Sequence, residues 1–141
     1  MQVFVPYPSP INVACCMDEK RLNKQIIECQ QILDAIDGKS DAWKNHPVTK
    51  MYTPYREWLD RYKICLKKYQ EGDMDTATWW SNHANLIRPE WMTMTFCDQH
   101  KRRLYTKAPT KYPQFEPYGE SEENWYIVDG QLKRYIKGKE V

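Results

Sequence analysis

Between residues 18 and 37, apolar side chains recur every three or four residues, which places them on one face of an amphipathic helix. Asp18 is suited to cap the start of this helix, and Gly38 is suited to end it. Glu19 follows in the first turn, where the helix dipole favours an acidic group. The apolar positions are Leu22, Ile26, Cys29, Leu33 and Ile36.

A second amphipathic helix is predicted over about 54–70, because Thr53-Pro54 is a typical helix start and Gly72 follows the last apolar position. The segment before it, 39–47, is predicted to be a loop, since His46 precedes a proline and so disfavours helix. Two further helices are expected, one over about 76–87 from a Thr76 cap and one over about 89–104 opened by Pro89. Residues 1–16, with three prolines, are expected to be extended, with a short strand at Val3–Val5.

Residues 125–136 predict a small β-hairpin, because two β-prone runs flank Asp129-Gly130. The fold class that follows is mainly α: a compact, single-domain helical fold over 1–141 with a small C-terminal β-hairpin. Length and composition agree with this class. A chain of 141 residues with 41% hydrophobic, 28% charged and 13% aromatic residues can bury a core of its own.

Cysteine and histidine patterns exclude the usual metal motifs. The five Cys form no CxxC pair and the three His form no HxxxH or HExxH pattern, so neither a zinc site nor any other cofactor is predicted. The thiols fit a reducing cytosol, which predicts a cytoplasmic protein. We expect no signal peptide and no membrane span, since no apolar run approaches 20 residues.

The net charge of +2 does not identify a nucleic-acid binder, but the distribution of charge is uneven. Residues 39–72 carry eight basic and four acidic groups, and residues 101–113 carry five basic groups and no acid. If the fold brings these two blocks together with Arg21, they form one positive face that could follow phosphates. The alternative is a solvated helix followed by a basic loop.

A polar stripe lies at the edge of the apolar face of the first long helix. At 100° per residue, Arg21, Gln25 and Glu28 fall within about 60° of one another. Such a stripe is typical of a helix that borders a cleft. The alternative is an ordinary structural ion pair between Arg21 and Glu28.

Two stretches carry a family resemblance. Residues 18–33 are DEKRLNKQIIECQQIL and residues 43–51 are WKNHPVTKM. Together with the opening MQVFVPY and the basic segment from His100 to Leu104, they resemble the pyrimidine dimer DNA glycosylase family, and more closely its uncharacterised bacterial and phage branch. The resemblance covers most of residues 1–113. It implies a compact helical domain that excises a base and then cleaves the strand at the abasic site.

The resemblance also implies site residues. Family members use the N-terminal amine and a Glu on the first long helix; the matching groups are Met1 and Glu28, which lies six residues after Leu22. Gln2 is too bulky for removal of Met1, Ile27 stands where the family has Arg, and Arg21 lies near the family's helix His. An α-amine suits imine chemistry near neutral pH better than a Lys side chain, although Lys24 is a second candidate amine. Around this centre, residues for binding nucleic acid or another ligand are Arg21, Lys24, Asn45, His46, His100, Arg102 and Arg103.

Two functions are therefore open from the sequence. The first is a DNA glycosylase and abasic-site lyase acting on damaged or modified bases in double-stranded DNA, by an amine–imine mechanism that Glu28 assists. The second is a non-catalytic phage accessory protein that binds DNA or sequesters a nucleotide with the same pocket. Neither the recognised base nor the oligomeric state follows from the sequence.

Overall fold

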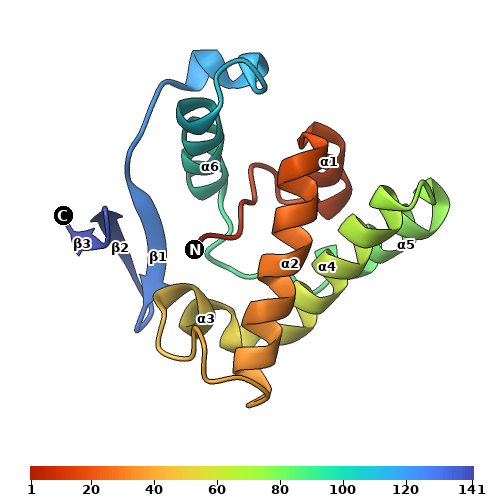
Figure 1. The fold of residues 1–141 in the computed structure, drawn as a ribbon, viewed down its shortest axis with the longest axis horizontal. Coiled ribbons are helices and arrows are strands. Elements are labelled where there is room, and N and C mark those ends of the chain that lie inside the picture. The colour runs from red at the N-terminus through yellow and green to blue at the C-terminus, as the bar shows by residue number, and fades with distance from the viewer.

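A computed structural model describes residues 1–141 as a helical body with a small sheet at one side (Figure 1). Helices α1, α2, α4 and α5 pack together, α6 stands beside them, and the sheet lies on the far side of α6 and α3. The N-terminus lies in the space bounded by α2, α6 and β1. The elements are α1 (Pro10–Cys16), α2 (Glu19–Ile36), α3 (Pro47–Tyr52), η1 (Thr53–Tyr55), α4 (Arg56–Gln70), α5 (Met74–Asn85), α6 (Met94–Lys107), η2 (Pro113–Tyr118), β1 (Asn124–Val128), β2 (Gln131–Ile136) and β3 (Lys139–Glu140).

Helices α2 and α4 correspond to the two helices that the apolar periodicity predicts. The Asp18 side chain accepts a hydrogen bond from the backbone N–H of Arg21, and Gly38 follows the helix with a φ of 75°. The left-handed conformation at Gly38 favours glycine and turns the chain away from α2. Both helices bury their apolar faces in one core, in which Trp58 of α4 is stacked between Tyr52 and Tyr62.

The strand expected at Val3–Val5 is absent. This segment is buried and extended, but side chains satisfy its backbone in place of a neighbouring strand. The Phe4 carbonyl accepts hydrogen bonds from Gln25 (2.8 Å) and from Tyr62 (2.7 Å). The N-terminal segment is therefore anchored to α2 and α4 and cannot slide between them.

Several helix boundaries differ from the expected ones. Helix α5 begins at Met74, two residues before the expected start, because Asp73 caps it instead of Thr76. Helix α6 begins at Met94, not at Pro89, because the Thr93 side chain accepts the hydrogen bond that caps it. Two short helices were not predicted from the sequence. α1 lies within 1–16, a segment expected to be extended, and α3 lies over 47–52, where no element was expected.

Proline explains both short helices. Pro10 and Pro47 each stand at the first helical turn, where a missing N–H costs nothing and the fixed φ suits a helix. His46 does stay extended, as expected for a residue before proline, and its ring caps α3 by accepting from the Val48 N–H.

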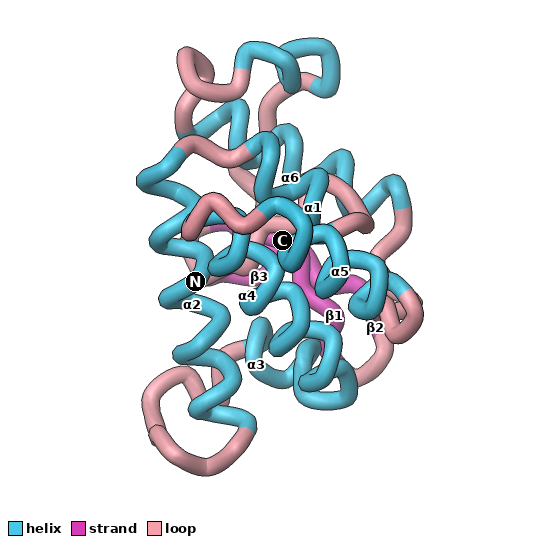
Figure 2. The backbone as a smooth tube through the Cα atoms, turned by 90° about the vertical axis from the view of Figure 1, so that its right-hand side faces the viewer, coloured by secondary structure: helices cyan, strands magenta, loops and turns pink.

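The C-terminal sheet contains the predicted hairpin and one more strand. β1 and β2 are antiparallel, with Val128 opposite Gln131 across the Asp129-Gly130 turn, and β3 adds a two-residue pairing to β2. Figure 2, the view from the right-hand side of Figure 1, shows strands only in this sheet, which lies behind the helices in this view. The mainly α class with a small C-terminal β element is confirmed. No helix combines the length and the apolar character that crossing a membrane requires.

Candidate functional site

A polar cleft of about 140 Å³ opens where the N-terminus, α2, α6 and β1 meet. It brings together residues that are far apart in the chain, and most of them are charged or carry an amide. Five positive groups surround a single carboxylate, that of Glu28. The lining residues are Met1, Gln2, Phe4, Arg21, Lys24, Glu28, Arg103, Lys107 and Asn124.

Glu28 and Arg21 form an ion pair across one wall of the cleft. Arg21 Nη1 lies 3.6 Å from Glu28 Oε1, and both side chains are largely buried. Two turns of α2 separate the two residues, so helix geometry superposes them on one face. The Arg21 guanidinium also lies over the Phe4 ring, 5.0 Å from its centroid, which fixes it at the base of the cleft.

Residue 1 is held at this cleft by the sheet and by the core. The Tyr126 hydroxyl of β1 donates to the Met1 carbonyl at 2.9 Å. The next residue, Gln2, is buried, and its side-chain amide contacts His100 Nε2 at 3.2 Å. Two contacts on either side of the first peptide therefore direct the Met1 amine into the cleft.

The pKa of the Met1 amine is below its ordinary value. Partial burial is the main cause, Lys107 and Lys24 lower it further, and the nearby Glu28 carboxylate opposes them. The pKa of the Lys107 ammonium is also lowered, first by desolvation and then by Arg103, Arg21 and Lys24. The cleft is thus a region of positive potential with more cations than carboxylates, which favours an anionic ligand.

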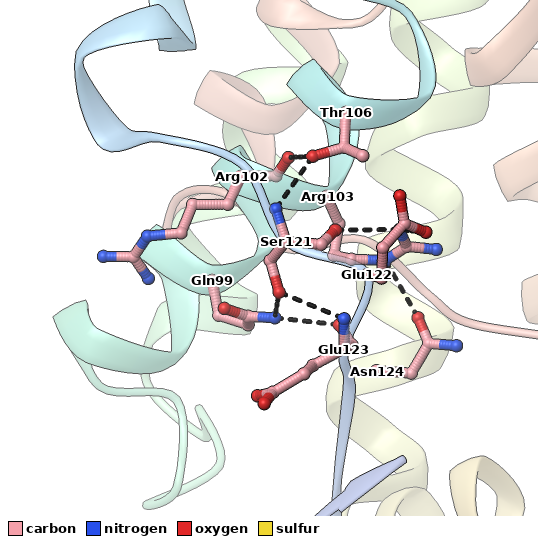
Figure 3. A network of polar contacts seen from close by, with 8 residues as sticks. All are labelled: Gln99, Arg102, Arg103, Thr106, Ser121, Glu122, Glu123 and Asn124. Carbon is pink, nitrogen blue, oxygen red and sulfur yellow. Dashed lines mark hydrogen bonds and ion pairs between the residues drawn. The ribbon is translucent and has the colours of Figure 1, made fainter. Parts of the chain in front are cut away.

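The far wall of the cleft is fixed by a polar network between α6 and the segment that leads into β1 (Figure 3). Arg103 donates through Nε to Asn124 Oδ1 at 3.0 Å and through Nη1 to the Ser121 carbonyl at 3.0 Å. Gln99 donates to the Ser121 hydroxyl and to the Glu123 carbonyl. These contacts hold the Arg103 guanidinium and the Asn124 amide side by side at the edge of the cleft.

A cationic groove of about 320 Å³ continues from the cleft between α2 and the C-terminal end of α6. It shares Arg21, Lys24 and Lys107 with the cleft. Neither Lys24 nor Lys107 forms an ion pair. We call it the α2–α6 groove; it is lined by Asp18, Lys20, Arg21, Lys24, Leu104, Lys107, Ala108, Lys111 and Tyr112.

Only one of the two basic blocks reaches this groove. Lys107 and Lys111 come from block 101–113, as expected, but Lys63 and Lys67 of block 39–72 line a different groove between α2 and α4. That second groove contacts Gln30, which lies about 180° around α2 from Arg21 at 100° per residue. The expected merger of both blocks on one face with Arg21 is therefore wrong for Lys63 and Lys67, because α2 stands between them and Arg21.

The remaining predicted site residues lie at different depths. His46 is partly buried beside the cleft, and the lowered pKa of its ring comes from desolvation and from the charge of the N-terminal amine. Asn45 is exposed on the loop before α3. Arg102 points away from Arg103 and donates to the Tyr118 carbonyl at 2.8 Å, so it does not line the cleft (Figure 3).

His100 lies in the core and not at a surface that a ligand could reach. Only 1% of it is exposed, Phe4 and Phe96 pack against its ring, and its Nδ1 accepts from the Val5 N–H at 2.7 Å. Burial lowers the pKa of the ring to about 3, so it is neutral. Its contacts with Gln2 and Val5 position the N-terminal segment.

The contributors that sequence reasoning missed include Lys107, Asn124 and Tyr126. The charge of block 101–113 pointed to Lys107, but the contacts of Asn124 and Tyr126 depend on the packing of β1 against the N-terminus and left no local signal. No group of three or more His, Cys, Asp or Glu side chains is arranged to hold a metal ion.

A family model described as pyrimidine dimer DNA glycosylase matches residues 1–71, half of the chain. The matched part contains Met1, Arg21, Lys24 and Glu28, and it ends just after α4. Neither curated proteins nor solved structures gave a match to this chain.

Proposed function

The chain belongs to the pyrimidine dimer DNA glycosylase family, and from that membership we propose that it is a DNA glycosylase with abasic-site lyase activity, working through an amine–imine mechanism. The family match indicates glycosylase activity on DNA and favours an enzyme over a non-catalytic binder. The observation that carries the mechanism is the polar cleft in which an amine of lowered pKa and a largely buried carboxylate face the same small space.

The Met1 amine is the proposed nucleophile. It attacks C1′ of the damaged nucleotide, the N–C1′ bond forms, and the glycosidic bond breaks as the base leaves with a proton. An amine reacts only in its neutral form, and an α-amine already titrates at about 7.7–8.0. The lowered pKa of Met1 increases its neutral fraction near pH 7. Lys24, which lines the same cleft, is the second candidate amine.

Glu28 is the proposed general acid/base. Its carboxylate can take a proton from the nitrogen of the adduct and give that proton to the ring oxygen as the sugar opens to the imine. The carboxylate formed again is then the proposed base that takes a proton from C2′. Loss of that proton breaks the C3′–O bond and releases the 3′ phosphate, and water hydrolyses the imine to free the amine. Arg21, 3.6 Å away, keeps the carboxylate oriented toward the cleft.

The α2–α6 groove is the proposed path of the DNA backbone. It adjoins the cleft and shares three cations with it, so a strand whose sugar lies at Glu28 can place its neighbouring phosphates beside Lys20, Lys107 and Lys111. Phosphate contacts of this kind orient a duplex without reading its sequence. Base recognition must come from elsewhere in the site.

The test is borohydride trapping on duplex DNA containing one abasic site. We expect a covalent complex with the protein, and peptide mapping should locate the adduct on Met1. Glu28→Gln preserves the side-chain shape and should lower strand cleavage by roughly two or more orders of magnitude, the usual scale for a lost general acid/base. The control is Glu19→Gln, an exposed Glu in the first turn of the same helix, which should cleave at the wild-type rate.

Three results would contradict the mechanism in different ways. An adduct on Lys24 would move the nucleophile while keeping the imine. A stable Glu28→Gln protein that cleaves normally would remove Glu28 from the chemistry. A wild-type protein that binds abasic DNA but gives no adduct would restore the non-catalytic alternative.

A further inference from the structure

Trp43 combines two unfavourable features in the loop between α2 and α3. Its backbone has a φ of 64°, the left-handed conformation that bulky residues rarely adopt. The residue as a whole is 39% exposed, although burying an aromatic ring normally stabilises a protein. Strained backbone that persists in a folded protein is concentrated at functional sites.

A fixed set of contacts holds the indole in this position. Its ring packs edge-on to His46, with centroids 5.5 Å apart. His46 cannot rotate freely, because its Nδ1 accepts from the Val48 N–H at 3.1 Å and caps α3. The loop itself, 37–46, leads from the lower end of α2 to α3 in Figure 1.

The same contacts connect Trp43 to the cleft. His46 packs edge-on against Tyr126, with centroids 5.5 Å apart, and Tyr126 donates to the Met1 carbonyl. Two ring contacts and one hydrogen bond therefore connect the indole to the residue that supplies the proposed nucleophile. The α2–α6 groove approaches the cleft from Lys20 at the other end of α2, so the two features lie on either side of Glu28 along that helix.

We propose that the exposed Trp43 indole is a stacking platform for an unpaired nucleobase next to the reacting sugar. This inference rests on the proposed function. An enzyme that reaches C1′ must take a nucleotide out of the stack, which leaves a base face exposed to water. Stacking on an aromatic ring covers that face without regard to base identity. The exposed Lys39 and Lys44, in the same loop, suit the phosphates of that strand.

Trp79 provides a matched control, because it is more exposed than Trp43 but is built differently. It lies on α5 and is 52% exposed. One of its faces is already covered by His83, at a centroid distance of 3.7 Å. Trp79 lines neither the cleft nor the α2–α6 groove.

The experiment uses a duplex with a stable tetrahydrofuran abasic analogue flanked by 2-aminopurine, a fluorescent base that stacking quenches. Wild-type protein should quench the emission. Trp43→Ala should abolish the quenching and weaken binding roughly 5- to 150-fold, the range that corresponds to losing one base–aromatic stack. Trp43→Phe should retain most of both signals, and Trp79→Ala should behave as wild type.

Circular dichroism and thermal melting of each variant separate a stacking loss from a folding loss. A folded Trp43→Ala protein that quenches and binds as wild type would overturn the platform, while borohydride trapping by that same variant would leave the proposed function intact. A change in oligomeric state with unchanged DNA affinity would also overturn it, since the indole would then contact a second copy. Absence of trapping in wild-type protein would instead refute the proposed function.

Discussion

At the scale of single residues, His100 shows how a side chain predicted to bind a ligand can serve the core. A run of three basic residues, 101–103, follows it directly in the sequence, which suggested an exposed position. Its burial depends on Phe4 and Phe96, and the first of these is nearly a hundred residues away. Glu28 was easier to predict, because its position beside Arg21 follows from the period of one helix.

Because the buried His100 ring is neutral, we expect the free energy of unfolding to fall as the pH is lowered. The unfolded chain binds a proton at this His below about pH 6.5, whereas the folded protein does so only near pH 3, so acid favours the unfolded state in between. Between pH 6.5 and 4, the free energy of unfolding should fall by up to about 1.4 kcal/mol per pH unit on account of this group. Urea unfolding at several pH values measures the slope.

His100→Gln should flatten that slope, since the amide can accept from the Val5 N–H and does not titrate. His83→Gln is the control, because His83 lies on α5, outside the core cluster. An independent check is the NMR titration of the wild-type ring. A His100 resonance that titrates near pH 6.5 would contradict the assignment, whatever the stability of the variant.

At the scale of elements, the two long helices were predictable and the short ones were not. α2 and α4 each bury a full apolar face, so their periodicity is visible over four or five turns. α1 and α3 have two turns or fewer, and packing against neighbouring helices stabilises them more than local preference does. The absent strand at Val3–Val5 has the same origin, because its partners are side chains from distant helices.

The face assignment of α2 predicts the effect of two substitutions on stability. Leu33 is 2% exposed within the core cluster, so Leu33→Ala should lower the free energy of unfolding by roughly 2–5 kcal/mol. Ile27 lies on the same helix but is 50% exposed, and Ile27→Ala should cost less than about 0.5 kcal/mol. Denaturant unfolding of both variants measures the difference. Equal losses would mean that the helix is rotated relative to the structure.

At the scale of the whole molecule, the candidate site is assembled from both halves of the chain. The family match ends at residue 71, yet Arg103, Lys107 and Asn124 complete the cleft. The N-terminus and Glu28 could be predicted together because the family resemblance and one helix face define them. The wall formed by α6 and β1 could not, because it depends on long-range contacts between the C-terminal sheet and the first residues.

The division of basic residues between two grooves gives a prediction for DNA binding by the intact protein. Lys20 and Lys107 line the α2–α6 groove without a carboxylate partner, so a phosphate would be their main counter-charge. Replacing both with Gln should weaken binding to abasic duplex by roughly ten-fold or more at moderate salt, and should reduce the slope of log K against log salt by about two. Fluorescence anisotropy across a salt series measures both quantities.

The second groove supplies a control with the same change in net charge. Lys67 and Lys68 are on α4 and line the groove between α2 and α4, on the side of α2 opposite to Arg21. Lys68 is already paired with Glu71. Lys67→Gln with Lys68→Gln should change the affinity less than three-fold, roughly the effect of long-range charge alone at moderate salt. If both double variants lost affinity equally, binding would follow the net charge of the protein, and the α2–α6 groove would not be the path of the backbone. If only the second pair mattered, the DNA would lie across the α2–α4 groove, on the opposite side of the helix that carries Glu28.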